Sequence, residues 1–375
     1  MISIKIDQKK EKALNHLHGL FVEAWTSLQD VSPSELDYLH RFAFISTIGA
    51  STRIENALLT DHEIEWIDTT LKEDSQATSF EAKKEFIVDK LLKDRERSLE
   101  EVAGCREVLG SVYTQYKDLF PLTEASIRGL HHDLLRYYPA AGGYAGSYKK
   151  SPNRVISINH STKEERVVLE PASPGIITET AMSDLVGWYN ETLREHPRPL
   201  LVAIEFVFRF LAIHPFQDGN GRLGRALFLL ALLQSDDKYL AGITPYLAID
   251  RHIEKNRANY YSVLHRTSEG KFFPHPGNYD FVPLVEFFLK VFEDSLSDID
   301  LYRKRYADML ELSASAATVF EAFRNNPKER LQVAELVQNT SLPRRTIQYV
   351  LKTLTEKGFL QRLGKGAGSR YQLAF

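Results

Sequence analysis

Cysteine and long apolar runs are nearly absent from this sequence of 375 residues. Cys105 is the only cysteine, which excludes a disulfide framework and a cysteine-rich zinc site and fits a reducing compartment. The N-terminus lacks the basic start, apolar run and small-residue cleavage site of a signal peptide, so the expected location is cytoplasmic. Glu205 and Arg209 interrupt the most apolar stretch, 200–216, so no segment reaches the roughly 18 to 20 apolar residues of a membrane span. No membrane partner is expected.

Charges of both signs are abundant but unevenly distributed. Hydrophobic residues make up 43% of the chain and charged residues 26%, which excludes a disordered or fibrous protein and allows two or three domains. Residues 313–375 contain ten basic and four acidic residues, whereas residues 1–312 contain 37 and 46. A basic C-terminal domain on an acidic body indicates separate partners for the two parts.

The fold class predicted by the apolar periodicity is mainly α. Residues 9–110 have few glycines and prolines and show helical spacing, and Thr123 is a predicted N-cap of a further helix. The segment 200–213 is apolar nearly all round, as expected of a central buried helix. Another apolar helix, 223–233, follows a glycine-rich turn, and no internal repeat is evident.

Two short β-branched segments interrupt this helical pattern. They span residues 154–159 and 165–170 and are joined by a polar turn. Pro139 and the glycines after it separate them from the preceding helix. The pattern predicts one β-hairpin in a helical protein.

Residues 313–375 predict a winged helix-turn-helix domain. The expected elements are helices at 318–324, 333–339 and 343–357 and strands at 359–363 and 370–373. Pro343 is expected at the first position of the recognition helix. The basic residues of that helix and of the wing are Arg344, Arg345, Lys352, Arg362, Lys365 and Arg370. This distribution of basic residues is typical of a surface that binds duplex DNA. Winged helices also serve as dimerisation or protein-docking modules.

The residues best suited to catalysis and ligand binding are clustered in 214–225, HPFQDGNGRLGR, at the expected N-terminus of a helix. Gly219, Asn220 and Gly221 can turn successive backbone N–H groups toward one point. The positive end of the following helix acts in the same direction. The turn can therefore bind an anion such as a phosphate.

Four side chains around this turn supply the groups that phosphate chemistry needs. Arg222 and Arg225 are three residues apart in the first helical turn and can reach phosphates from the same side. Asp218, directly before the turn, can hold a hard cation such as Mg²⁺ that bridges phosphate oxygens. His214, on the other side of the turn, can accept a proton from an attacking hydroxyl.

Two other motifs point to different chemistry and are set aside on context. Gly219, Gly221 and Gly224 form GxGxxG, but they follow a buried helical segment instead of a strand in a βαβ unit, so a dinucleotide fold is not expected. His131 and His132 are adjacent on a helix and point about 100° apart. Because the chain contains no HExxH, packing is expected of them instead of metal ligation.

The string from His214 to Arg225 resembles, without a gap, the HPFxDGNGRxxR signature of the Fic family. Fic proteins are helical enzymes that mostly transfer AMP from ATP to a Ser, Thr or Tyr hydroxyl of a target protein. The resemblance extends over about residues 110–250. The related Doc toxins, which act as kinases, depart at the residue after the aspartate, where this sequence keeps Gly219. The resemblance therefore implies nucleotidyl transfer rather than phosphoryl transfer.

Carried over position by position, the resemblance implies a role for each residue of the string. His214 would be the general base, Asp218 the Mg²⁺ ligand and Phe216 the anchor of the loop in the core. The nucleotide-binding residues would be Gly219, Asn220, Gly221, Arg222 and Arg225. Such transfer needs positioning, a metal and a base, and the string supplies all three.

The predicted hairpin resembles the flap that precedes the signature in Fic proteins, and it would span Lys149–Glu170. It could dock an extended target segment by adding a strand, which would present a hydroxyl to His214. Tyr144, Tyr148 and Lys149 could touch nucleotide or target, but the pattern is more typical of solvated loop residues.

Residues 51–56, STRIEN, resemble the (S/T)xxxE(G/N) inhibitory motif of many Fic proteins. The other interpretation is a helix end with Asn56 as C-cap. The resemblance implies that Glu55 pairs with Arg225 and occupies the guanidinium that should hold the γ-phosphate. A bond of about 1.5 to 3 kcal/mol need not prevent ATP binding, and a shift of about 1 Å at the α-phosphate can cost on the order of a hundredfold in rate. This glutamate can also support the reverse reaction, hydrolytic removal of AMP.

The sequence thus predicts a helical region with an inhibitory helix (1–110), a Fic catalytic domain with a β-hairpin flap and a helical extension (111–312), and a winged-helix domain (313–375). The predicted function is transfer of AMP from ATP, with Mg²⁺, to a hydroxyl of a target protein or of the chain itself, restrained by Glu55. The alternative is a DNA-binding regulator whose Fic core senses nucleotide or removes AMP. An intact His214 favours catalysis. DNA and a second copy of the chain are further candidate partners.

Overall fold

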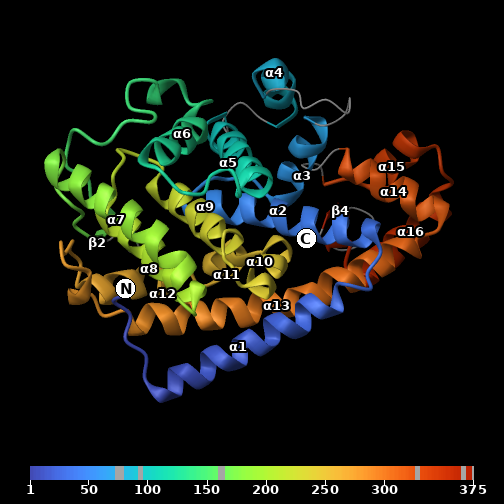
Figure 1. Cartoon of the computed structure of the whole chain (residues 1–375). Coiled ribbons are helices and arrows are strands. Elements are labelled where there is room, and N and C mark those ends of the chain that lie inside the picture. Colours follow the sequence, from blue (N-terminus) through green and yellow to red (C-terminus); the bar gives the residue numbers. More distant parts are fainter. Residues whose placement is uncertain (72–79, 92–95, 159–164, 326–329, 365–368, 374–375) are drawn as a thin grey trace. The chain divides into compact units, whose positions relative to one another are not determined.

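The structure, a computed structural model, describes residues 1–71, 80–91, 96–158, 165–325, 330–364 and 369–373 (Figure 1). These residues are mainly helical, with two small antiparallel sheets, as the sequence predicts. They form two compact units, one of Met1–Ala57 and Glu100–Ile299 and the other of Leu58–Leu99 and Asp300–Phe375. Among the described helices, none combines the length and the hydropathy that crossing a membrane requires.

The helices before the hairpin are α1 (Gln8–Ser27), α2 (Pro33–Ile54), α3 (Asp61–Thr70), α4 (Phe80–Leu91), α5 (Glu96–Gln115) and α6 (Glu124–Leu135). Those after it are α7 (Ile176–Glu195), α8 (Pro199–Ile213), α9 (Asn220–Leu233), α10 (Lys238–Ile243), α11 (Ile249–Lys255), α12 (Arg257–Ser268) and α13 (Val282–Leu310). Short 3-10 turns lie at Pro139–Ala141, Thr244–Tyr246 and Pro276–Asn278.

The centre of the first unit is α8, which packs between α7 and α9 (Figure 1). Every residue of α8 except Arg209 is buried, because the helix is apolar nearly all round, with Glu205 the one buried charged residue in it. Pro199 occupies its first turn, where a missing N–H costs nothing. The helix ends at His214 in the left-handed conformation, and α9 begins six residues later. The loop between the two central helices therefore has a rigid support on both sides.

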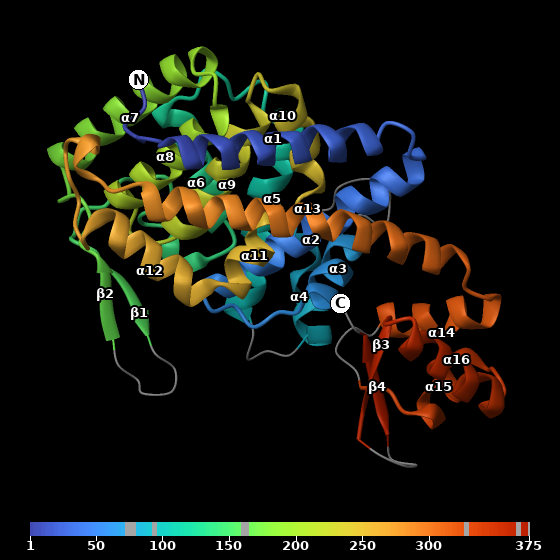
Figure 2. The same cartoon turned by 90° about the horizontal axis from the view of Figure 1, so that it is seen from below.

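The predicted hairpin is formed by β1 (Val155–Ile158) and β2 (Glu165–Leu169). The strands are antiparallel, and their register shifts between Val155 and Ile156. The base of the hairpin is bound to the loop after α12, where Glu170 exchanges hydrogen bonds of 2.8 and 2.9 Å with Gly270 and Phe272. Figure 2 shows the strands extending from the base beside α12. The connecting residues, including Asn159, lie outside the described residues.

The C-terminal residues form the predicted winged helix-turn-helix. Its elements are α14 (Ala314–Arg324), α15 (Val333–Thr340), α16 (Arg344–Glu356), β3 (Leu360–Leu363) and β4 (Arg370–Leu373). Their apolar sides share one core, which includes Phe323, Leu336 and Ile347. Pro343 precedes α16 as its N-cap, so its expected place inside the helix was wrong by one residue. Lys365 of the wing lies outside the described residues.

Candidate active site

His214 lies at the C-terminal end of α8 with φ 50°, a conformation that is uncommon for a residue with a side chain. Its Nδ1 is 3.2 Å from the carbonyl oxygen of Leu211. Because a carbonyl only accepts, Nδ1 carries the proton of the neutral ring and Nε2 is left as an acceptor. Burial, together with the nearby Lys149 ammonium, lowers the pKa of His214 to about 4. The ring is therefore neutral near pH 7 and can accept a proton.

The loop after His214 is held by Asn220 and Phe216. The Asn220 amide accepts from the backbone N–H of Phe216 at 2.9 Å and donates to its carbonyl at 2.7 Å. The Phe216 ring is fully buried, as expected of a core anchor. Gly219 has φ 77° and precedes α9 directly, a position that favours glycine. The first N–H groups of α9 thus begin at the turn that the sequence predicts to bind an anion.

His131 of α6 supports the same loop from behind. Its ring stacks on Phe216 with centroids 3.8 Å apart and planes 7° from parallel. The Gly146 N–H donates to Nδ1 at 2.9 Å, so the ring proton is on Nε2, which lies 2.9 Å from the Asp218 carbonyl. Burial lowers the pKa of His131 to about 4. The expectation of packing was right for His131, but the sequence did not reveal its hydrogen bond to the loop.

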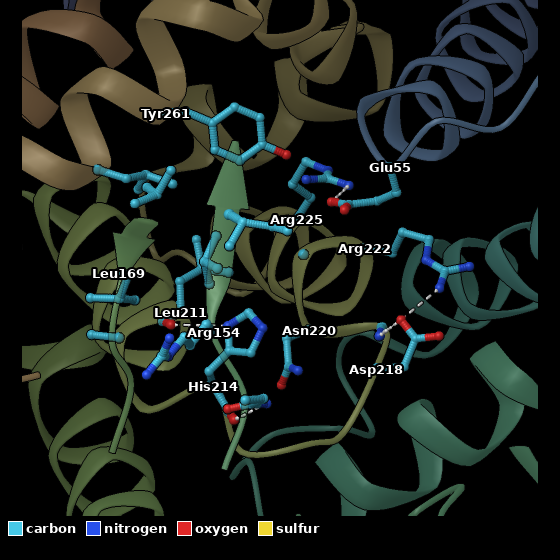
Figure 3. A pocket seen from close by; sticks show the side chains of 18 of the residues that line it. Glu55, Arg154, Leu169, Leu211, His214, Asp218, Asn220, Arg222, Arg225 and Tyr261 are labelled. Atoms are coloured by element: carbon cyan, nitrogen blue, oxygen red, sulfur yellow. Dashed lines mark hydrogen bonds and ion pairs between the residues drawn. The ribbon is translucent and has the colours of Figure 1, made fainter. Parts of the chain in front are cut away.

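Arg225 is buried and is surrounded by acceptors. Its Nη2 lies 2.9 Å from Glu55 Oε1 (Figure 3). The same Nη2 lies 2.7 Å from the Ser51 carbonyl, and Nε donates to Ser51 Oγ at 2.9 Å. Asp250 Oδ2 lies 3.6 Å from Nε. Burial disfavours the charge, but the Glu55 and Asp250 carboxylates outweigh it and raise the pKa of Arg225. The guanidinium is therefore held as a cation at one side of the cavity.

Glu55 is itself the C-cap of α2, and Asn56 follows with φ 74°. The helix-end interpretation and the contact with Arg225 thus hold together, although the cap is Glu55 and not Asn56. Arg53, two residues earlier, forms hydrogen bonds of 2.7 and 2.9 Å with Glu254 of α11. Arg257 of α12 donates to the Asn56 side chain at 2.9 Å. The end of α2 is therefore tied to α11 and α12 on both sides of Glu55.

Arg222 and Asp218 lie at the other end of the turn (Figure 3). Arg222 Nη2 is 3.5 Å from Asp218 Oδ1, and Nη1 is 3.7 Å from Glu101. The Arg222 side chain is 2% exposed, and within the described residues Nε and Nη1 are buried without an acceptor at hydrogen-bond distance. Ligand oxygens could satisfy these donors. The two arginines do not share a partner, since each faces a different carboxylate.

These residues surround a cavity of about 270 Å³. Its polar side is formed by His214, Asp218, the turn 219–221, Arg222 and Arg225, and Glu55 projects into it (Figure 3). Its apolar side is formed by Val168, Leu169, Phe208, Leu211, Tyr261 and Leu264. Such a division suits a ligand with a flat apolar ring at one end and anionic groups at the other.

A magnesium ion would have one carboxylate ligand here. Asp218 lines the cavity and its side chain is 36% exposed. In the described part of the chain no cluster of three or more His, Cys, Asp or Glu side chains could hold a metal. Mg²⁺ commonly takes one or two carboxylates and completes its shell with substrate phosphates and water. Asp218 fits that ligand set when a nucleotide supplies the remaining oxygens.

Sequence reasoning missed Asp250, Tyr261 and Lys149. Tyr261 of α12 lines the cavity, whereas Asp250 of α11 lies behind Arg225, 3.6 Å from its Nε. Both lie outside any motif and are placed by the packing of their helices. Lys149, expected to be a solvated loop residue, is 3% exposed and lies beside the residues around His214. No sequence signal within these segments distinguishes them from ordinary helix or loop residues.

Comparison with known proteins agrees with this geometry. The model of the Fic/DOC family matches residues 121–232, and that of the IclR helix-turn-helix domain matches residues 315–364. The "Protein adenylyltransferase fic-1" of Caenorhabditis elegans is 31% identical over 104 residues, which are 28% of this chain and 18% of the relative. The matched region thus spans about a fifth of that relative's length.

Two further relatives match over more of their own length. A Fic family protein from Desulfovibrio desulfuricans G20 shares the fold with a TM-score of 0.55 and 22% identity, covering 100% of this chain and 98% of that one. A Fido domain-containing protein of Dictyostelium discoideum is 30% identical over 112 residues, which are 27% of this chain and 73% of the relative. With the loop geometry and the match at residues 121–232, this similarity shows that the chain belongs to the Fic/DOC family.

Proposed function

We propose that this chain transfers AMP from ATP to a hydroxyl group of a protein and that Glu55 restrains the reaction. The observation that carries the proposal is the convergence of His214, the turn 219–221 and Arg225 on one cavity, with Glu55 bonded to the arginine. The family membership and the name of the C. elegans relative, a protein adenylyltransferase, support the same reaction.

ATP would lie with its phosphates on the turn and its base against the apolar side of the cavity. The N–H groups at the start of α9 and the positive end of that helix would bind phosphate oxygens. Arg222 would contribute the buried donors that have no acceptor within the described residues. Asp218 would hold Mg²⁺, which neutralises phosphate charge when it is bound.

His214 would act as the general base. The hydroxyl oxygen of the target attacks the α-phosphorus while Nε2 accepts the hydroxyl proton. The new oxygen–phosphorus bond forms as the bond to the bridging oxygen of the leaving pyrophosphate breaks, so the products are an AMP ester and pyrophosphate. The Leu211 carbonyl keeps Nδ1 protonated and the ring oriented, so that Nε2 alone accepts.

Glu55 would compete with the γ-phosphate for Arg225. Ser51 and Asp250 also hold the guanidinium, so removal of the Glu55 carboxylate leaves Arg225 in place and frees the N–H of Nη2 that Glu55 had accepted, while Nη2 still donates to the Ser51 carbonyl. A γ-phosphate that cannot reach Arg225 leaves the α-phosphate displaced from the incoming hydroxyl. Displacement of about 1 Å is enough to lower the rate on the order of a hundredfold.

The full-length Glu55→Gly variant tests the reaction type. It is incubated with Mg²⁺, cell extract and ATP labelled at either the α- or the γ-phosphate, and proteins are separated on a denaturing gel. The α-label alone is expected to appear on protein. Labelling from the γ-label would replace the proposal with a kinase. No labelling from either, with release of AMP from previously labelled protein, would replace it with the hydrolase of the alternative.

The winged helix supports a second function, binding to duplex DNA. Arg344, Arg345 and Lys352 of α16 and Arg362 and Arg370 of the wing strands are all exposed. Duplex binding would weaken with salt, because phosphate contacts release counterions. Arg345→Ala and Lys352→Ala should each weaken binding and lower the salt slope by about one, whereas Lys290→Ala on α13 should not. Affinity unaffected by α16 substitutions would favour a protein-docking role.

A further inference from the structure

Lys149 is a buried lysine beside the loop that carries His214. The residue is 3% exposed, and its Nζ donates to the Ile213 carbonyl at 3.1 Å and to Asn153 Oδ1 at 2.9 Å. Among the residues that the structure describes, no carboxylate lies at ion-pair distance from it. Burial of an ammonium group without a counterion costs free energy. Packing alone therefore does not explain why a charged residue occupies this position.

The contacts of Lys149 lie on both sides of His214. Ile213 is the last residue of α8, where a cation stabilises the negative end of the helix. The backbone N–H of Lys149 donates to the Pro215 carbonyl at 2.8 Å. Asn153, bound to the ammonium group, donates to the Phe216 carbonyl at 2.8 Å. The segment that begins at Lys149 thus binds the backbone directly before and after the base.

We propose that Lys149 is a positioning residue for the general base: its ammonium group fixes the backbone directly before and after His214 and places a buried positive charge near the imidazole. This inference rests on the proposed function of His214. The positive charge of Lys149, as well as its hydrogen bonds, therefore has a role in the reaction.

The electrostatic part follows from the sign of the charges around His214. Burial is the largest influence on the pKa of His214, and the Lys149 ammonium lowers it further because two positive charges repel. Glu55 and Asp218 act in the opposite direction. Burial lowers the pKa of Lys149 to about 8, so most of its charge remains at pH 7. Without Lys149 the pKa of His214 would rise toward its ordinary value, so the imidazole would become protonated, and lose its acceptor nitrogen, at a higher pH.

The experiment measures the protonation of His214 directly. Full-length protein carrying Glu55→Gly and ¹³Cε1-labelled histidine is titrated by NMR, and the His214 signal is assigned by its absence in His214→Ala. The Lys149→Met variant should move the His214 midpoint upward by about one pH unit, the effect expected when one nearby unit charge is removed from a partly buried site. Lys149→Arg should leave the midpoint unchanged. Lys150→Met, at the exposed neighbouring residue, is the matched control and should also leave it unchanged.

The pH profile of AMP transfer gives the second readout. The acidic limb of Lys149→Met should move upward with the NMR midpoint, whereas Asn153→Ala, which keeps the charge, should lower transfer equally at every pH. An unmoved midpoint in Lys149→Met overturns the proposal and leaves Lys149 a structural role. If that variant does not fold, Lys149→Gln keeps a donor for the Ile213 carbonyl without the charge, and an unmoved midpoint there has the same meaning.

The two proposals fail in different ways. If no variant transfers AMP but the midpoint moves, the proposed function fails and the effect of the Lys149 charge on His214 stands. If transfer occurs and the midpoint does not move, the proposed function stands and the role of Lys149 fails.

Discussion

Breaking the ion pair between Arg53 and Glu254 should raise AMP transfer without changing the cavity. Arg53 lies two residues before Glu55 at the end of α2, and its guanidinium forms two hydrogen bonds with the Glu254 carboxylate of α11. The two side chains are 24% and 27% exposed, so the pair lies between the surface and the buried limits. We expect it to stabilise the position of Glu55 by about 1 kcal/mol. Loss of about 1 kcal/mol raises the fraction of molecules in which Glu55 has left Arg225 about fivefold.

The assay compares steady-state AMP transfer by four full-length proteins: wild type, Glu254→Gln, Glu55→Gly and the double variant. Glu254→Gln should be about fivefold more active than wild type, and Glu55→Gly on the order of a hundredfold. In the Glu55→Gly background the second substitution should add nothing, because no carboxylate remains to be released. Asp294→Asn, which breaks the ion pair with Lys290 on α13, is the control and should leave activity unchanged. An equal gain in both backgrounds, or no gain in wild type, would refute the reasoning.

Three further predictions concern the fold. A Cβ at Gly104 would lie 1.9 Å from the Leu134 carbonyl oxygen, so Gly104→Ala should lower the free energy of unfolding by about 3 kcal/mol or more. Gly110 has open space where a Cβ would lie, so Gly110→Ala should raise the free energy of unfolding by about 0.5 to 1 kcal/mol. Urea unfolding of the two variants checks both values. Burial lowers the pKa of His131 from an ordinary 6.5 to about 4, so the folded state favours the neutral ring. The contribution of this ring to the free energy of unfolding is therefore complete above pH 6.5 and decreases as the pH falls toward 4, by about 2 kcal/mol at pH 5. His131→Gln should lose less stability than wild type between pH 7 and pH 5, and an equal loss would contradict the assignment. Burial raises the pKa of Cys105 to about 12, so a thiol reagent at pH 8 should react only as fast as the protein unfolds.

Much of the fold and the loop could be predicted because the signals are local. The apolar residues of 200–213 and 223–233 place α8 and α9 without reference to the rest of the chain. The glycine-rich turn between them also needs only its own residues. Glu55 and Arg225 are 170 residues apart, and only the family resemblance indicated that they meet. The contact is present, whereas its inhibitory role stays a prediction.

The rest of the site depends on approaches between distant segments, which no local pattern encodes. Lys149 follows glycines and a tyrosine, a context typical of an exposed loop. It is buried because residues 213–216 lie against it and supply carbonyl acceptors. Asp250 of α11 meets Arg225 of α9 because both helices pack against α2. Interpretations based on spacing therefore miss buried polar groups whose partners come from elsewhere in the chain.

The most direct test of the central claim, that a carboxylate on Arg225 restrains a transfer driven by His214, is the amount of α-labelled AMP on protein. Wild type, Glu55→Gly and Glu55→Gly/His214→Ala are incubated with labelled ATP and Mg²⁺ and separated on a denaturing gel. We predict strong label with Glu55→Gly, little with wild type and none with the double variant. Equal label on wild type and Glu55→Gly would contradict the restraint, and label on the double variant would contradict the role of His214.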